Sequence, residues 1–204
     1  MKVALKITTI LGVVGYIQGN GYLSKPDAED VKYMSMTLNY TLAQNPCSFA
    51  PFGASIVNKN TGEILCFGIN ASSDNPTWHG EIAALNNCST LYPGNGLNSS
   101  FWKELTLYTT GEPCPMCQSA ILWSHIGRLV YSTSIKTLTK LGWSQIQVTS
   151  LELANKATAS DFTLLEIVPK LLHEKTDPLF AWQYNEHKAC PSGCHRQKKT
   201  CVPN

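Results

Sequence analysis

The sequence predicts an α/β protein in which helices cover both faces of a central sheet, so that the chain forms three layers. Apolar residues recur at helical spacing in residues 28–43. Two short apolar segments, 54–57 and 63–68, are joined by the polar run 58–62, as expected for a strand hairpin. Strand-like and helix-like segments then alternate, and this order predicts a sheet with helices on both sides.

Local signals define the elements in turn. The first helix has one apolar face that we expect to pack on the sheet, formed by Val31, Met34, Leu38 and Leu42. Thr77 is placed to cap a second helix, which carries His79, Glu81, Ile82 and Leu85. Residues 105–109 alternate as a strand and lead into a helix that begins near Pro113 or Pro115 and ends before Gly127.

The pattern becomes weaker toward the C-terminus. Residues 128–132 predict another strand, whereas 163–172 is compatible with a strand or a short helix interrupted by Pro169. Residues 177–185 are rich in aromatic side chains. Core packing is the simpler interpretation of these aromatics.

One motif indicates a catalytic metal site: H-G-E at 79–81, followed by P-C-P-M-C at 113–117. Catalytic zinc binds three protein ligands and keeps one position for water, and His79, Cys114 and Cys117 would hold one zinc ion per chain. A helix that starts beside Cys114 places both sulfur atoms on one face, and its N-terminal dipole favours thiolates. Glu81 is then the predicted proton shuttle.

The C-x-x-C spacing alone is weak evidence, because it also fits a redox pair, half of a structural zinc site, or two disulfide cysteines. A redox pair needs no H-x-E motif upstream. A structural site would use a fourth protein ligand in place of water. The combined motif resembles the signature of zinc-dependent base deaminases, which replace an exocyclic amine with a carbonyl group.

Further segments resemble guanine deaminases and tRNA adenosine deaminases, and they follow the family order along the chain. They are residues 51–54, 75–77, 107–114 and 126–131. Residues 79–82 with Asn87-Cys88 are more similar to fungal cytosine deaminase, and Trp78 and Gly80 stand where the purine and tRNA enzymes usually carry small alanines. The resemblance implies a cytidine-deaminase-like fold with a central five-stranded mixed sheet, and it suggests a homodimer.

The same resemblance implies the substrate contacts. Asn70 would hydrogen-bond the base, since an amide both donates and accepts. Phe52 and Trp123 would form apolar walls, although plain core packing is the alternative for each. The Glu112 carbonyl would receive the leaving amine, and the Cys114 backbone N–H would face the reacting centre. The resemblance to guanine deaminases also implies that the aromatic segment 177–185 closes over the base, as the alternative to core packing.

The chain ends differ from this central region. Residues 1–21 carry Lys2 and Lys6 beside an apolar run too short to span a bilayer, which predicts a cleaved signal peptide; an uncleaved anchor or a buried first helix is the alternative. We expect a deaminase domain over 22–187 and a Cys-rich basic tail over 188–204, more typical of a solvated, disulfide-tied end than of a nucleic-acid arm.

Two features favour an oxidising compartment and a secreted protein. The first is a set of four N-x-S/T glycosylation acceptors at Asn39, Asn70, Asn87 and Asn98. The second is the set of six cysteines left after the two predicted ligands, enough for three disulfides whose pairing stays open, at Cys47, Cys66, Cys88, Cys190, Cys194 and Cys201. Buried free thiols in a cytosolic enzyme are the alternative. We expect Asn70 to carry no glycan, because a glycan there would block the substrate.

Charge argues against a nucleic-acid partner. The chain has 16 basic and 14 acidic residues, and without Lys2 and Lys6 the numbers are equal. A neutral mature protein lacks the broad basic surface that RNA or DNA binding requires. The leading hypothesis is therefore a deaminase of a small nucleobase or nucleoside, guanine-type first and cytosine- or cytidine-type second. Polynucleotide editing and a non-catalytic secreted binding protein are the alternatives.

Overall fold

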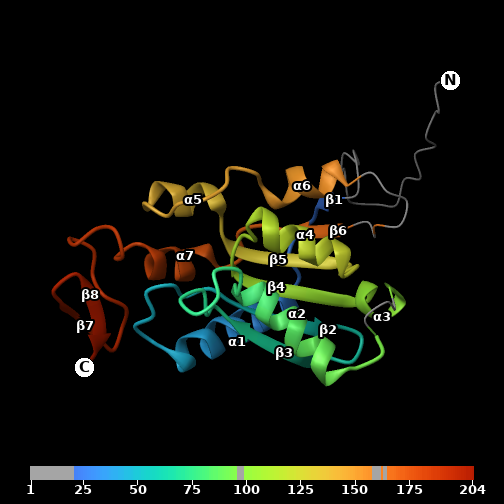
Figure 1. The fold of residues 1–204 in the computed structure, drawn as a ribbon, viewed down its shortest axis with the longest axis horizontal. Coiled ribbons are helices and arrows are strands. Elements are labelled where there is room, and N and C mark those ends of the chain that lie inside the picture. Colours follow the sequence, from blue (N-terminus) through green and yellow to red (C-terminus); the bar gives the residue numbers. More distant parts are fainter. Residues whose placement is uncertain (1–20, 96–98, 158–161, 163–164) are drawn as a thin grey trace.

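The computed structural model describes residues 21–95, 99–157, 162 and 165–204. A mixed six-stranded sheet lies at its centre, with strand order β1-β6-β5-β4-β2-β3 (Figure 1). Neighbouring strands are parallel from β1 to β4, whereas β2 is antiparallel to both β4 and β3. The strands are β1 (Gly21–Leu23), β2 (Gly53–Asn58), β3 (Glu63–Ile69), β4 (Leu105–Gly111), β5 (Arg128–Thr133) and β6 (Leu165–Val168).

The sixth strand corrects the expected count of five. β1 has only three residues and pairs along the edge of the sheet with β6, Gly21 opposite Leu165. So short a segment has no recognisable alternation of its own, and its strand conformation depends on the partner. β6 settles the ambiguity of residues 163–172: within the described residues the strand ends at Val168, directly before Pro169.

Helices cover both faces of the sheet, so the three-layer prediction is confirmed (Figure 1). On one face, Tyr33 and Met34 of α1 pack with Tyr108 and Val130 of the central strands. On the other face, α2 lies mainly against β3 and β2, α6 lies against β1, and α4 packs beside α6, in a core cluster that includes Leu107 of β4 and Leu129 of β5. The helices are α1 (Ala28–Gln44), α2 (Gly80–Leu91), α3 (Ser99–Lys103), α4 (Pro115–Trp123), α5 (Ile135–Lys140), α6 (Ser150–Lys156), α7 (His173–Thr176) and the 3-10 helix η1 (Asp177–Phe180).

An ion-pair network joins α1 to the sheet. Asp27 caps the helix, and its backbone N–H donates in return to Asp30 Oδ2 at 2.8 Å. The fully buried Asp30 carboxylate also accepts two bonds from the Arg128 guanidinium, at 2.5 and 2.7 Å, and one from the Tyr108 hydroxyl at 2.8 Å. Arg128 begins β5, so this network lies at the opposite end of the strand from the loops that follow the carboxyl ends of β4 and β5.

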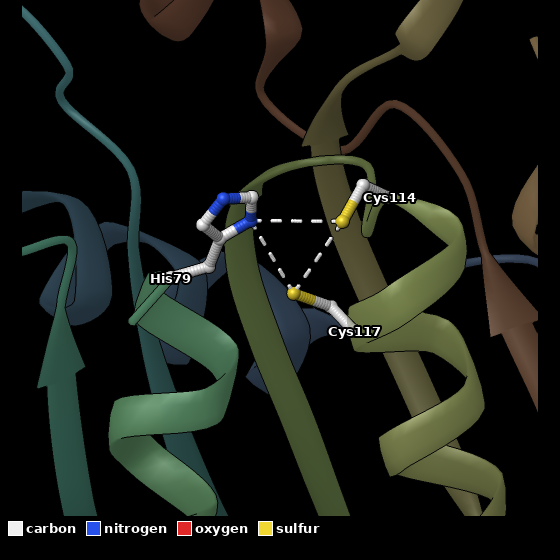
Figure 2. Close-up of side chains that lie close together, drawn as sticks. All are labelled: His79, Cys114 and Cys117. Atoms are coloured by element: carbon white, nitrogen blue, oxygen red, sulfur yellow. Dashed lines mark hydrogen bonds between the residues drawn. The ribbon is translucent and has the colours of Figure 1, made fainter. Parts of the chain in front are cut away.

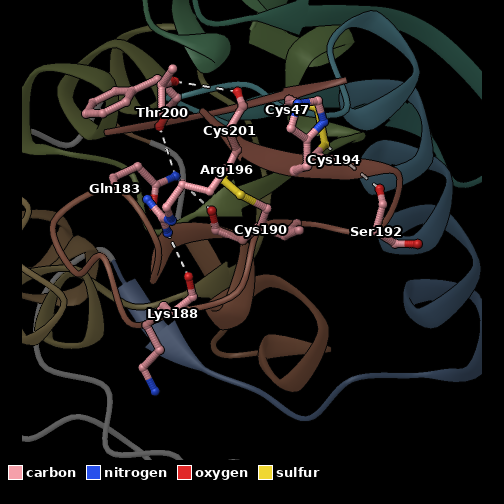
Figure 3. The surroundings of a disulfide bond; sticks show 12 residues. Cys47, Gln183, Lys188, Cys190, Ser192, Cys194, Arg196, Thr200 and Cys201 are labelled. Carbon is pink, nitrogen blue, oxygen red and sulfur yellow. Dashed lines mark hydrogen bonds between the residues drawn. A yellow bond between two sulfur atoms is a disulfide. The ribbon is translucent and has the colours of Figure 1, made fainter. Parts of the chain in front are cut away.

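Three disulfides use the six cysteines that were expected to pair: Cys47–Cys194, Cys66–Cys88 and Cys190–Cys201. Two of them tie down the tail, which folds as a hairpin of β7 (Cys194–Gln197) and β8 (Thr200–Pro203). Figure 3 shows how Cys190–Cys201 closes the hairpin and Cys47–Cys194 joins it to the segment after α1. Disulfides therefore tie the C-terminal hairpin both to itself and to the segment after α1.

Some predictions fall outside the described residues. Of the segment 1–21 that was predicted to be a signal peptide, the structure describes only Gly21, and Asn98 also lies outside the described residues. In the described part of the chain, no helix combines the length and hydropathy that a membrane crossing needs.

Candidate active site

The predicted metal ligands lie at the starts of two helices beside the central strands. His79 is the N-cap of α2 and Cys114 is the N-cap of α4, each with an extended backbone that turns its side chain away from the helix axis. Pro115 occupies the first position of α4, where its missing N–H costs nothing. Thr77 was expected to cap α2, which is wrong: the helix starts one residue after His79, and the Thr77 hydroxyl instead donates to Asn75.

His79, Cys114 and Cys117 form a nearly regular triangle (Figure 2). His79 Nδ1 lies 3.6 Å from each sulfur, and the two sulfurs are 3.7 Å apart. Zn–S bonds of about 2.3 Å and Zn–N bonds of about 2.0–2.1 Å give a tetrahedron with edges of about 3.5–3.8 Å. The side chains therefore fit a zinc ion, with one nitrogen and two sulfurs as donors.

Of the three groups in the triangle, Cys114 is the one whose pKa shift favours metal binding, because a metal ligand must be deprotonated. The hydrogen bond from Cys117 lowers the pKa of Cys114 to about 4, and His79 contributes in the same direction. The two thiols share one proton, which together with burial raises the pKa of Cys117. The bond to Cys114 also raises the pKa of His79. A divalent cation would displace the remaining protons from these groups.

Glu81 lies in the first turn of α2, beside the triangle, with only 4% of its surface exposed. Burial is the largest influence on this carboxyl and raises its pKa to about 7. The Thr109 hydroxyl of β4 lies 3.4 Å from its Oε1 atom. A carboxyl with this pKa can both take up and release a proton near neutral pH, as a proton shuttle must.

Glu81, His79 and Cys114 line a cavity of about 180 Å³, whereas Cys117 is fully buried behind it. The cavity contains four of the five predicted substrate contacts, namely Asn70, Phe52, Glu112 and Cys114. The Asn70 amide donates to the Ser72 hydroxyl at 3.0 Å, which orients it at the cavity wall.

Trp123 does not lie with these residues. It is the last residue of α4, whereas Cys114 precedes the first, and a helix rises about 1.5 Å per residue. The indole is 71% exposed and packs edge-on against Phe162 at 4.9 Å between ring centroids. The prediction that it forms a wall of this pocket is therefore wrong for the described structure.

A wall that sequence reasoning missed comes from the segment after α5. Trp143, Ser144 and Gln145 line the cavity, together with Ala50 and Ser72. The local sequence signal for this wall is the pair Gly142-Trp143, which comes directly after a helix. The contacts that hold the wall in place are made by residues distant in the sequence.

Aromatic residues far along the chain hold this wall. The Trp143 indole N–H donates to the Phe180 carbonyl at 2.9 Å, and its ring meets Phe52 edge-on at 5.2 Å. Phe180 and Trp182 are fully buried, so the core interpretation holds for both. Tyr184 is 53% exposed, and its ring meets the Trp143 ring edge-on with 5.3 Å between the ring centroids.

Two glycines allow α2 to approach the sheet closely. A Cβ atom on Gly68 of β3 would lie 2.1 Å from the Ala84 nitrogen, and one on Gly80 would lie 3.0 Å from Gly53 Cα. Gly80 therefore serves backbone packing, which places His79 and Glu81 against the end of β2.

Comparisons with known proteins agree with this geometry. A probable cytosine deaminase from Schizosaccharomyces pombe is 31% identical over 116 residues, which cover 55% of this chain and 65% of that protein. A tRNA-specific adenosine deaminase from Buchnera aphidicola is 41% identical over 92 residues, 44% of this chain and 52% of that protein. Guanine deaminase from Bacillus subtilis is 27% identical and covers 67% of this chain and 74% of the enzyme. The first two matches therefore span about half to two thirds of the relatives' lengths.

Solved structures share the fold. A guanine deaminase from Nitrosomonas europaea superposes with a TM-score of 0.57 at 18% identity, covering 91% of this chain and 98% of that one. The protein NE0047 in complex with 2,6-diaminopurine gives a TM-score of 0.61 at 21% identity, covering 81% and 86%. Residues 27–133, which contain the whole His79–Cys117 triangle, match one sequence family, and the chain belongs to it: the family of the cytidine and deoxycytidylate deaminase zinc-binding region.

Proposed function

We propose that this chain is a zinc-dependent hydrolytic deaminase of a free nucleobase, guanine-type first, which releases ammonia and leaves a carbonyl on the ring. The observation that carries the proposal is the zinc-sized triangle beside the buried Glu81 carboxyl, with His79, Cys114 and Glu81 lining one cavity. Zinc, when bound, supplies an activated water near neutral pH. Glu81 moves the protons: it would carry one proton from the attacking water to the ring nitrogen, and then the proton of the hydroxyl group formed on the ring carbon to the amine, which departs as ammonia and leaves the carbonyl.

The cavity supports a single base as the substrate. Pockets for drug-sized ligands enclose about 300–1,000 Å³, and this one encloses about 180 Å³. Phe52 and Trp143 offer aromatic walls for a flat ring, while the Asn70 and Gln145 amides offer both donors and acceptors to its edge. Two named neighbours are complexes with 8-azaguanine and 2,6-diaminopurine, and both ligands are bases.

Ammonia release from the zinc-loaded protein tests the function. Guanine, guanosine, adenosine, cytosine and cytidine form the panel, and we expect guanine to be turned over fastest. The S. pombe relative makes cytosine the second candidate. Turnover of none of the five would refute the proposal, and salt-dependent RNA binding with activity on RNA would revive polynucleotide editing.

Glu81→Gln separates an enzyme from a binding protein on the same scaffold. The amide keeps the shape of the side chain but carries no titratable proton. We expect turnover to be abolished while zinc content and thermal stability stay near the wild-type values. An effector activity that survives the substitution, with no wild-type turnover, would favour the non-catalytic alternative.

We also propose that the mature protein is secreted. Three disulfides support this, since such bonds persist in oxidising compartments. Expression of the full chain in a eukaryotic cell, followed by N-terminal sequencing of the medium fraction, tests both secretion and cleavage near residue 21. Retention of the intact chain inside the cell would contradict the proposal.

A further inference from the structure

The Glu112 carboxylate links the loop before Cys114 to both ends of the segment that carries the cavity wall Trp143–Gln145. It is 5% exposed and stands two residues before Cys114. Its Oε2 atom accepts the Ile135 N–H at 2.9 Å, and its Oε1 atom accepts the Ser150 N–H at 3.0 Å. Its own N–H donates to the Thr133 carbonyl at 2.7 Å, so β5 holds its backbone.

The two N–H donors lie before and after the wall in the sequence. Ile135 is the first residue of α5 and Ser150 is the first residue of α6, and the segment between these helices carries Trp143, Ser144 and Gln145 into the cavity. One carboxylate therefore holds both helices that deliver the wall.

Capping of the helices does not explain this arrangement. Each already has a cap: the Ser134 hydroxyl accepts the Thr137 N–H, and the Thr149 hydroxyl accepts the Glu152 N–H. Glu112 binds the N–H groups at the first helical positions, which have no partner inside the helix. Its distinctive effect is therefore on where α5 and α6 lie relative to the zinc ligands.

We propose that Glu112 is a positioning residue, whose carboxylate holds the Trp143–Gln145 wall in register with the zinc site and so sets the affinity for the base. A carboxylate suits the task because two N–H donors converge on its two oxygens. A glutamine would turn its NH₂ group toward one of them and lose that bond. The expected change in affinity for the base rests on the proposed function, whereas the expected change in the position of the wall does not.

Glu112→Gln is the test, with Glu152→Gln as the matched control. Glu152 is an exposed acid in the capping box of the same α6 helix, but it makes no contact with the zinc loop in the described structure. For Glu112→Gln we expect KM for the preferred base to rise about tenfold or more, as loss of a hydrogen bond to a charged group implies. We expect kcat to change by less than about threefold, with zinc content unchanged. Glu152→Gln should leave KM near the wild-type value.

Hydrogen–deuterium exchange gives a readout that needs no turnover. In Glu112→Gln, exchange should accelerate in residues 141–150 while the amides of α2 keep their protection. If the protein turns over no base, this measurement together with zinc content still decides the inference. Unchanged KM and unchanged exchange would overturn it, as would a fall in kcat caused by lost zinc.

Glu112→Asp is the second variant if the glutamine protein does not fold. It keeps the charge but withdraws the carboxylate by one methylene group, so the same direction of change is expected. Failure of both variants to fold would overturn the inference, because Glu112 would then be a core residue rather than one that positions the wall.

Discussion

Asp30→Asn should destabilise the fold while leaving the candidate active site intact. Asp30 is fully buried and accepts hydrogen bonds from Arg128 and Tyr108. Burial alone would raise the pKa of Asp30, but the bonds from Arg128, the backbone and Tyr108 outweigh it and hold the pKa at about 2. Relative to an ordinary aspartate, this shift corresponds to about 2 kcal/mol of stability.

The full cost is larger than the titration part, because the neutral amide of the variant would remove the carboxylate that accepts two hydrogen bonds from the Arg128 guanidinium, leaving Arg128 with its ion pair to Glu166 at 2.9 Å. Breaking a buried pair in this way costs about 3–5 kcal/mol. Urea denaturation at pH 7 should therefore show a loss of that size for Asp30→Asn. Zinc content of the folded fraction should not change, since Arg128 and the zinc ligands lie at opposite ends of the sheet.

The direction of the pKa shift determines how the stability contribution of Asp30 changes with pH. The folded pKa of Asp30 is below the unfolded one, so the stabilisation is complete above the unfolded pKa and is lost as pH falls through the folded pKa of about 2. The difference between wild type and Asp30→Asn should therefore shrink as pH falls from about 5 toward 2. A difference below about 0.5 kcal/mol at pH 7, or one that grows with acid, would refute this reasoning.

Three other outcomes are expected. Gly68→Ala should prevent native packing of α2, because its Cβ atom would lie 2.1 Å from a backbone nitrogen; circular dichroism and zinc content test this, and a native-like protein with bound zinc would contradict it. Replacing both Cys66 and Cys88 with serine opens a loop spanning 22 residues and should cost about 3 kcal/mol in denaturant unfolding, whereas equal stability would contradict a role for this disulfide. Glycopeptide mass spectrometry of secreted protein should find Asn70 unoccupied, because it lines the cavity; an occupied site would argue against its predicted role in base binding.

Local sequence patterns were sufficient to predict which side chains come together as candidate metal ligands. His79, Cys114 and Cys117 lie next to helix starts, and a proline after a cysteine signals such a start from sequence alone. Glu81 follows at a fixed offset of two residues, so its place beside the triangle depends on one helical turn. The alternation of helix and strand similarly predicted the three layers, because each element buries an apolar face with its own period.

The tertiary structure alone decided which other residues meet the site. Trp123 is distant because α4 carries it away from Cys114, and Trp143 is close because Phe180, 37 residues later, holds it there. The same is true of Glu112, whose partners Ile135 and Ser150 lie on two later helices. A local pattern records the face that a residue presents but not the distant segment that packs against it. The His79–Cys114–Cys117 triangle could therefore be predicted along the chain, whereas the cavity wall around Trp143 forms only when the chain folds.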